Sequence, residues 1–259
     1  MSATDGLPPL IRPVWSAPTS VRAAMTTRHG GVSAAPFGAL NLGYATADQR
    51  EDVMENERRT AAALGVGTNA LRWVYQVHGA EVRVAESLPA NTPLGATEIQ
   101  ADAIVCRTPG IVCGIKVADC MPVLLADDAG RCVGAAHAGW RGLAAGVIEN
   151  TLAQMGADPA RVSVWLGPCI GPTAFEVGED VRDVFVHQDA AAAQHFVPHG
   201  APGKFLCDLP AIARHRLARA GVTRITTSGA CTYGDAAQFF SHRRDRVTGR
   251  MAAFVWLVH

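Results

Sequence analysis

The sequence predicts a mixed α/β (α+β) protein, in which packed mixed β-sheets are flanked by outer helices. Short apolar runs separated by turn residues recur along the chain, amphipathic helical segments alternate with them, and hairpin-type connections are common. No glycine-rich nucleotide fingerprint follows a predicted strand, so a doubly wound parallel sheet is the second choice. The chain has no internal repeat or long linker, and we expect residues 1–259 to form one domain, with residues 1–19 as an N-terminal extension.

Glycine, proline and charge patterns divide the first part of the chain into loops, a helix and strands. The predicted elements are an ordered loop at 28–43, a surface helix over 49–66 that ends at Gly65, two strands over 71–87 with a bend at His78-Gly79, and a loop at 87–100.

The second part is richer in apolar runs, which favour strands, and in amphipathic runs, which favour helices. The predicted elements are several strands between 101 and 140 with turns at 108–110 and 127–130, a helix at 144–157, a strand at 161–167, a rigid loop at 168–172, helices at 176–188 and 208–221, and strands at 224–229 and 254–258.

Composition excludes several classes of function. Lysine plus arginine equals aspartate plus glutamate, at 23 each, so we expect no basic surface for nucleic acid. No apolar run is long enough for a membrane span, and the N-terminus has no secretory pattern. Seven cysteines without a CxxC pair are typical of buried thiols in a reducing compartment, so we expect a cytoplasmic protein.

Three short motifs place a possible metal ligand where an apolar strand gives way to a turn. "QVHG" contains His78, "ADCMP" contains Cys120, and "HAGWRG" contains His137. Two imidazoles and one thiolate suit zinc, and three protein ligands leave a fourth position for water or substrate. Asp119 precedes the cysteine and could orient a ligand or act as a base. A single histidine at a strand end is more often an ordinary hydrogen-bonded residue, so spacing alone leaves the ligand set open.

Arginines near these motifs suggest an anion site. Arg141 begins the helix after His137, where free N–H groups and a guanidinium fork could bind phosphate or carboxylate. The alternative is a surface ion pair for Arg141, and Trp140 could either stack on a substrate ring or pack in the core. Further candidates are Arg28 in a glycine loop, Asn41 in "LNLG", and an anion-binding wall formed by Phe239, Phe240 and the arginines at 243, 244, 246 and 250.

The motifs "TRHGGVS", "LNLG", "QVHG", "ADCMPVLL", "HAGWRG", "GPCIGP…FEVG", "CTY" and "FFSHRRD…TGRMA" occur in an order typical of one family. From about residue 20 to its C-terminus, the chain resembles the laccase-domain, or multicopper polyphenol oxidase-like, family. Bacterial members are also described as peptidoglycan editing factors and purine nucleoside phosphorylases. The resemblance implies a fold similar to a class of proposed cysteine hydrolases.

The resemblance also implies a zinc site made by His78, Cys120 and His137, with copper possible in vitro. The implied activities are phosphorolysis of adenosine, inosine, guanosine and methylthioadenosine, and deamination of adenosine. We expect the protein to be a monomer or a homodimer. Cys120, His137 and Asp119 are then the expected catalytic residues, and Arg28, Asn41, Arg141 and Arg243 the expected substrate-binding residues. We assign no role to Cys169.

Two other enzymatic functions compete with this one, and a non-enzymatic binding protein is a third alternative. In a cysteine hydrolase that edits peptidoglycan precursors, Cys120 would be the nucleophile and His137 its base. In a copper-dependent polyphenol oxidase, the two histidines and Cys120 beside Met121 would resemble a blue-copper site. The nine histidines include no HxH pair, which argues against a multicopper centre. Dependence of activity on zinc separates the nucleoside enzyme from the cysteine hydrolase.

Overall fold

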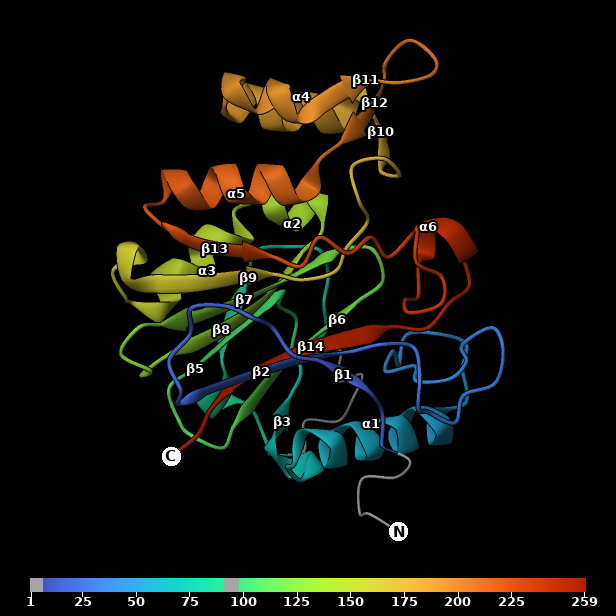
Figure 1. Ribbon diagram of the computed structural model, residues 1–259, viewed down its shortest axis with the longest axis vertical. Coiled ribbons are helices and arrows are strands. Elements are labelled where there is room, and N and C mark those ends of the chain that lie inside the picture. Colours follow the sequence, from blue (N-terminus) through green and yellow to red (C-terminus); the bar gives the residue numbers. More distant parts are fainter. Residues whose placement is uncertain (1–6, 91–97) are drawn as a thin grey trace.

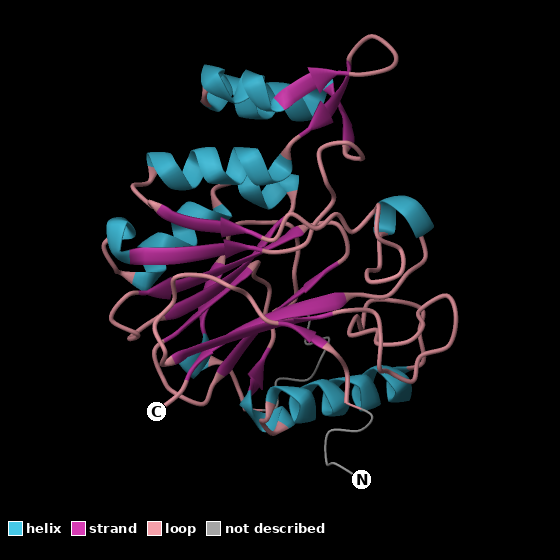
Figure 2. Cartoon of the chain, in the orientation of Figure 1, coloured by secondary structure: helices cyan, strands magenta, loops and turns pink. Residues whose placement is uncertain are grey.

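The computed structural model describes residues 7–90 and 98–259. Two stacked β-sheets form the middle of the molecule, and helices cover their outer faces (Figures 1 and 2). Helix α1 (Arg50–Leu64) lies against the outer face of one sheet, and α3 (Val147–Met155) and α5 (Leu209–Arg219) cover the other. This arrangement confirms the predicted mixed α/β fold with packed sheets and outer helices.

The five-stranded sheet has the order β1-β2-β14-β6-β3. Its strands are β1 (Leu10–Ile11), β2 (Val21–Thr26), β14 (Met251–Leu257), β6 (Val112–Val117) and β3 (Leu71–Arg72). The last strand of the chain, β14, lies antiparallel between β2 and β6, so segments from both ends of the chain meet at the centre of this sheet.

The six-stranded sheet has the order β13-β9-β7-β8-β5-β4, with antiparallel central strands and a parallel pair at each edge. Its strands are β13 (Arg224–Thr227), β9 (Val162–Leu166), β7 (Met121–Asp127), β8 (Val133–Ala138), β5 (Ala103–Cys106) and β4 (Val82–Val84). Helices on one face and the other sheet on the second bury both faces, which explains the nearly continuous apolar character of β7 and β8.

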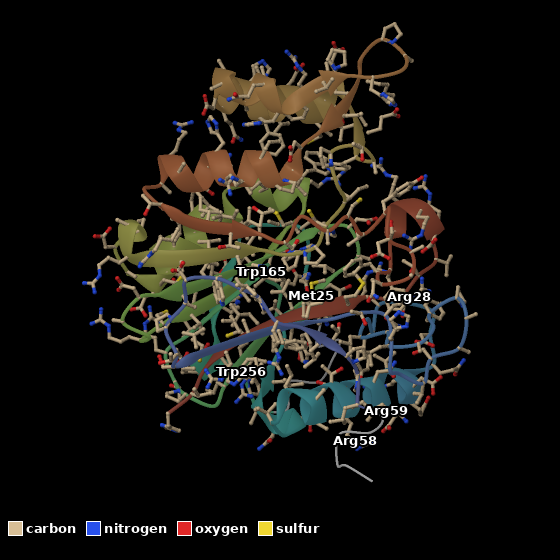
Figure 3. All side chains as sticks on the ribbon, viewed as in Figure 1. Met25, Arg28, Arg58, Arg59, Trp165 and Trp256 are labelled. Carbon is tan, nitrogen blue, oxygen red and sulfur yellow. The ribbon has the colours of Figure 1, made fainter. Side chains whose placement is uncertain are left out.

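Apolar side chains fill three layers. Met25 of β2 and Trp165 of β9 belong to the core between the sheets (Figure 3). Under α1, Trp73 packs edge-to-face on Phe254 with ring centroids 5.5 Å apart. A third layer, which includes Leu217, joins the six-stranded sheet to its helices. The two sheets are therefore packed against each other through an apolar core.

The remaining helices are short, and none of the described helices is long and apolar enough to cross a membrane. They are α2 (Trp140–Ala144), α4 (Glu179–Gln188) and α6 (His242–Asp245), with 3₁₀ turns at Thr68–Ala70, Ala85–Ser87, Pro159–Arg161 and Ala190–His195. As predicted, α1 ends at Gly65, whose φ of 77° lets its N–H cap the last turn.

Three predicted elements differ from the structure. The strands predicted over 71–87 form no pair, because β3 and β4 belong to different sheets and the chain crosses between them. The helix predicted over 144–157 is interrupted at Gly146, whose φ is 90°. The helix predicted from residue 176 begins three residues later, because Glu176–Gly178 form strand β10 of a small sheet with β12 (Lys204–Cys207) and β11 (Phe196–Pro198). The predicted loop at 87–100 lies partly outside the described residues.

Candidate metal centre and its cavity

The three predicted ligands converge at one end of the stacked sheets. His137 lies in β8 and Cys120 directly precedes β7, and the pairing of Pro122 with His137 brings them together from 17 positions apart. His78 arrives on the crossing between the two sheets. One ligand atom from each of the three side chains lies within 4.8 Å of the others. Metal–ligand bonds of about 2.0–2.3 Å fit between atoms at this separation.

The donor set matches an open metal site. His137 is buried and His78 is exposed, so the group is approached from the His78 side. Among residues 7–90 and 98–259, no fourth histidine, cysteine or acidic ligand joins the group. Two imidazoles and one thiolate with a free fourth position are typical of catalytic rather than structural zinc sites.

Asp102, which the sequence analysis did not single out, holds two of the ligands. Its buried carboxylate accepts a hydrogen bond from Nδ1 of His137 at 2.8 Å, which leaves Nε2 of that ring to face a metal. The same carboxylate accepts backbone N–H groups from Val77 (3.2 Å), His78 (3.0 Å) and Gly79 (2.7 Å). The one feature of the sequence that could have indicated Asp102 is its position as an acidic residue directly before the apolar strand 103–106.

Without a metal, the same contacts polarise the thiol. Burial raises the pKa of Cys120, but His137 and His78 outweigh it and lower that pKa to about 6. Burial lowers the pKa of His137, but Cys120 and Asp102 outweigh it and raise that pKa to about 9. The metal-free pair therefore favours a thiolate beside an imidazolium at neutral pH.

Glycines in "HAGWRG" permit close approach of the ligands. A Cβ on Gly139 would lie 2.7 Å from Sγ of Cys120, and a Cβ on Gly142 would lie 2.8 Å from the carbonyl oxygen of Gly79. Asp119 (φ 81°) and His78 (φ 62°) adopt left-handed backbone conformations, which are uncommon outside glycine and concentrate at functional sites.

Asp119 connects the turn that carries Cys120 to the C-terminal part of the chain through hydrogen bonds. One carboxylate oxygen accepts from Oγ1 of Thr232 at 2.6 Å, and the other accepts from Oγ of Ser241 at 3.0 Å and the N–H of Arg243 at 2.6 Å. Both oxygens are therefore engaged. This geometry supports a positioning role for Asp119 more directly than the base suggested from sequence.

A cavity of about 500 Å³ opens beside the three donors. It is lined by residues from both sheets, α2, α5, α6 and neighbouring loops, and these include Tyr44, Tyr75, Gln76, Lys116, Trp140, Arg141, Phe175, Arg243, Arg246 and Arg250. Cationic and aromatic side chains together suit a ligand with an anionic part and a flat ring.

Two of the three arginines expected to bind substrate, Arg141 and Arg243, reach this cavity. The guanidinium of Arg141 lies 4.3 Å from the Trp140 ring centroid and has no hydrogen-bond or ion-pair acceptor among the described residues. Arg243 donates to the carbonyl oxygen of Glu176 at 2.9 Å and lies 5.3 Å from the Phe175 ring. Helix α2 is only five residues long, so an anion site here would depend on the Arg141 side chain rather than on the helix end.

Arg28 does not line the cavity, contrary to the expectation for a substrate contact. Its guanidinium donates to the carbonyl oxygens of Gly38 (3.1 and 3.2 Å) and Ala236 (2.9 Å), and stacks 4.8 Å from the Phe240 ring. It lies beyond the end of β2 (Figure 3). These contacts occupy its donors and tie two loops together.

Asn41 acts on the cavity through its neighbours. Its buried side-chain oxygen accepts the N–H groups of Gly43 and Arg250, each at 2.8 Å, and its amide donates to Oγ1 of Thr46 at 2.9 Å. All three partners line the cavity. Asn41 therefore holds residues that line the cavity and does not line it itself.

The anion-binding wall predicted over 239–250 is only partly present. Phe239 and Phe240 are buried in the core between the sheets, and Arg244 donates to backbone carbonyls of Thr232, Tyr233 and Phe239. Arg243, Arg246 and Arg250 line the cavity. Cys169 is buried and is not among the residues lining it.

The sequence profile of the family described as "Multi-copper polyphenol oxidoreductase laccase" matches residues 22–258. The chain belongs to this laccase family. A solved laccase-family structure of similar fold, from Neisseria meningitidis, has a TM-score of 0.90 and 41% identity, covering 96% of this chain and 99% of that chain.

Two curated relatives of this laccase-family chain span nearly its whole length. One, from Pseudomonas aeruginosa, is 48% identical over 247 residues, covering 95% of this chain and 98% of the relative. The other, YfiH of Escherichia coli, is 45% identical over 249 residues, covering 96% and 99%. Both relatives are named purine nucleoside phosphorylases.

Proposed function

We propose that this chain is a zinc-dependent purine nucleoside enzyme that cleaves the glycosidic bond with inorganic phosphate. The observation that carries the proposal is the convergence of His78, Cys120 and His137, with an open position, beside Arg141, whose guanidinium has no acceptor in the described parts of the chain. The names of relatives at 45–48% identity support purine nucleosides as the substrate class.

In phosphorolysis, a phosphate oxygen bonds to C1′ of the ribose and the C1′–N9 bond breaks. The electron pair leaves with the purine, which takes up a proton, and the second product is ribose 1-phosphate, or 5-methylthioribose 1-phosphate from methylthioadenosine. Arg141 and Arg243 bind the phosphate and stabilise its charge. Trp140 and Phe175 bound the cavity with aromatic surface. Adenosine, inosine, guanosine and methylthioadenosine are the proposed substrates.

A bound zinc ion supplies a Lewis acid, which is the chemistry that adenosine deamination needs as a second reaction. The protein's part is to hold the donor set: Asp102 fixes the ring of His137 and the backbone at His78. Asp119 fixes the turn that presents Cys120. Copper can replace zinc in vitro, because it binds nitrogen and sulfur ligands more tightly.

A cysteine hydrolase that acts on peptidoglycan precursors is the second candidate. The observation that favours it is the sequence of contacts from Cys120 to His137 to Asp102, which matches the nucleophile, base and orienting group of a catalytic triad. A thiolate bound to metal is a poor free nucleophile, so the two proposals make opposite predictions about metal.

A multicopper oxidase is disfavoured despite the family description. In the part of the chain that the structure describes, the only group of three or more potential ligands is His78, Cys120 and His137. Oxygen reduction by such enzymes requires several copper ions, and this group can hold one.

The deciding experiment uses protein of defined metal content and a panel of purine nucleosides, with and without phosphate. Phosphate-dependent release of free base and ribose 1-phosphate, lost on chelation and restored by zinc, is the expected result. Activity on amide or ester substrates that survives complete metal removal would instead establish the hydrolase. A metal-replete protein that converts no nucleoside in either condition would refute the nucleoside proposal.

A further inference from the structure

Lys116 is a cation in the cavity that the proposed function does not yet use. It lies in β6 of the five-stranded sheet, whereas Arg141 reaches the cavity from α2, beyond the six-stranded sheet. The cavity therefore receives positive charge from two different layers of the fold.

The ammonium group of Lys116 has no acceptor. Among the described residues, no oxygen lies within hydrogen-bond or ion-pair distance of its Nζ. Nζ instead lies 5.0 Å from the centroid of the Trp73 ring, a cation–π contact. The indole N–H of Trp73 donates a hydrogen bond to the Glu57 carboxylate at 2.8 Å. This carboxylate is close enough to influence the Lys116 amine electrostatically, but it forms no ion pair with that amine.

The backbone of Lys116 is held firmly. The side-chain amide of Gln76 donates to its carbonyl oxygen at 2.7 Å and accepts from its N–H at 2.9 Å. Burial lowers the pKa of the Lys116 amine to about 8, against the raising effect of Glu57. A fixed and poorly solvated donor without an acceptor is destabilising unless a ligand supplies one.

The surroundings of Lys116 favour a flat heterocycle over a second phosphate. Tyr44 and Tyr75 line the cavity as well, and aromatic rings stack on bases. Guanine presents two acceptors, N7 and O6, on one edge, whereas adenine presents N7 beside an amino group. Hypoxanthine carries the same oxygen at position 6. An ammonium group only donates hydrogen bonds, so it matches the 6-oxopurine edge and opposes the adenine amine.

We propose that Lys116 selects 6-oxopurine nucleosides, inosine and guanosine, over adenosine by donating hydrogen bonds to O6 and N7 of the base. The proposal rests on the proposed function for its substrate class, and it places the base between Lys116 and the tyrosines. Lys116 is then a specificity-determining residue, while Arg141 and Arg243 receive phosphate.

The test measures equilibrium binding of inosine and adenosine, by calorimetry without phosphate, to protein whose metal has been removed by chelation, so that adenosine is not deaminated during the titration. Wild-type protein is expected to bind inosine at least about tenfold more tightly than adenosine, because a charged donor gains an acceptor with one base and meets an amine with the other. Lys116→Met, of similar length without a donor, is expected to abolish the preference through weaker inosine binding. Lys116→Arg, which keeps donors, should retain part of it.

Zinc content and the circular dichroism spectrum establish that each variant is folded. Three results would each overturn the inference. The first is a ratio of inosine affinity to adenosine affinity that is the same in Lys116→Met as in the wild type, and the second is no measurable binding of either nucleoside to wild-type protein. The third is a Lys116→Met variant that loses binding of inorganic phosphate but keeps its preference for inosine. If the protein binds inosine selectively but does not catalyse phosphorolysis, the role of Lys116 is supported and the proposed phosphorylase reaction is refuted. Failure of the Lys116 proposal can therefore be distinguished from failure of the proposed function.

Discussion

Asp102 accepts a hydrogen bond from Nδ1 of His137 at 2.8 Å, and the same carboxylate accepts the backbone N–H of His78 at 3.0 Å. One buried carboxylate thus orients a ligand in β8 and the segment that carries a second ligand. Candidate ligands on two separate segments are thus held at a distance suited to a shared metal ion.

Asp102→Asn is expected to weaken zinc binding about 10- to 100-fold, because an amide cannot accept all four hydrogen bonds and its NH₂ group opposes an N–H donor. Competition against a chromophoric chelator measures the affinity. Asp127→Asn is the matched control: that buried carboxylate accepts the N–H groups of Arg131 and Cys132 at the other end of β7. Equal zinc affinity in the Asp102 variant and the wild type would contradict the prediction.

His137→Ala and Arg141→Ala should separate metal binding from phosphate binding. The first removes a ligand and is expected to lose zinc, whereas the second should keep full zinc and raise the KM for phosphate about tenfold or more. Arg58→Ala, on the solvent side of α1, should change neither quantity (Figure 3). Metal analysis with a phosphate titration provides both readouts. Full zinc occupancy in the His137 variant would refute its assignment as a ligand.

Thr232→Val removes one of the three hydrogen bonds to the Asp119 carboxylate. A charged acceptor loses a buried donor, so the free energy of unfolding should fall by about 1–3 kcal/mol while zinc remains bound. Denaturant unfolding measures the stability. If Asp119 acts as a base as well, Asp119→Asn will lower kcat by far more than Thr232→Val does. An equal loss of kcat in the two variants would leave Asp119 with its positioning role alone.

Arg28→Met is expected to destabilise the fold without affecting phosphate. The substitution removes hydrogen bonds to Gly38 and Ala236, and we expect a loss of about 1–3 kcal/mol because the carbonyls lose a charged donor. Thermal unfolding and the KM for phosphate are compared in one preparation. A raised KM at unchanged stability would restore Arg28 as a substrate contact.

Lys116→Met should be more thermostable than wild type at pH 7, by a few degrees. In the folded protein, burial lowers the pKa of Lys116 from 10.5 to about 8, so the unfolded chain binds more protons between these values. The wild type therefore regains stability as pH rises from about 8 to 10.5, and the advantage of the variant should shrink over that window. A difference in Tm that stays constant from pH 7 to 10.5 would show that the lysine is not penalised by burial.

Local patterns predicted much of the framework. The charged amphipathic run ending at Gly65 gave α1, the apolar run after Arg161 gave β9, and the run at the C-terminus gave β14. These elements follow from helical or strand periodicity and from capping, which act between residues close in sequence. The sheet to which each strand belongs depends on distant partners, and for that reason the local pattern over 71–87 did not reveal that its two strands belong to different sheets.

For the candidate site, the sequence by itself determined the chemical kinds of donor and their position at strand ends: His78, Cys120 and His137 were all named from their motifs. Tertiary structure alone decided that they meet, since the register between β7 and β8 and the crossing between sheets act over long separations. It also brought Asp102 to His137, turned Arg28 to loop carbonyls, and placed Lys116 in the cavity. Contacts between distant residues depend on how whole sheets pack, which no local sequence pattern encodes.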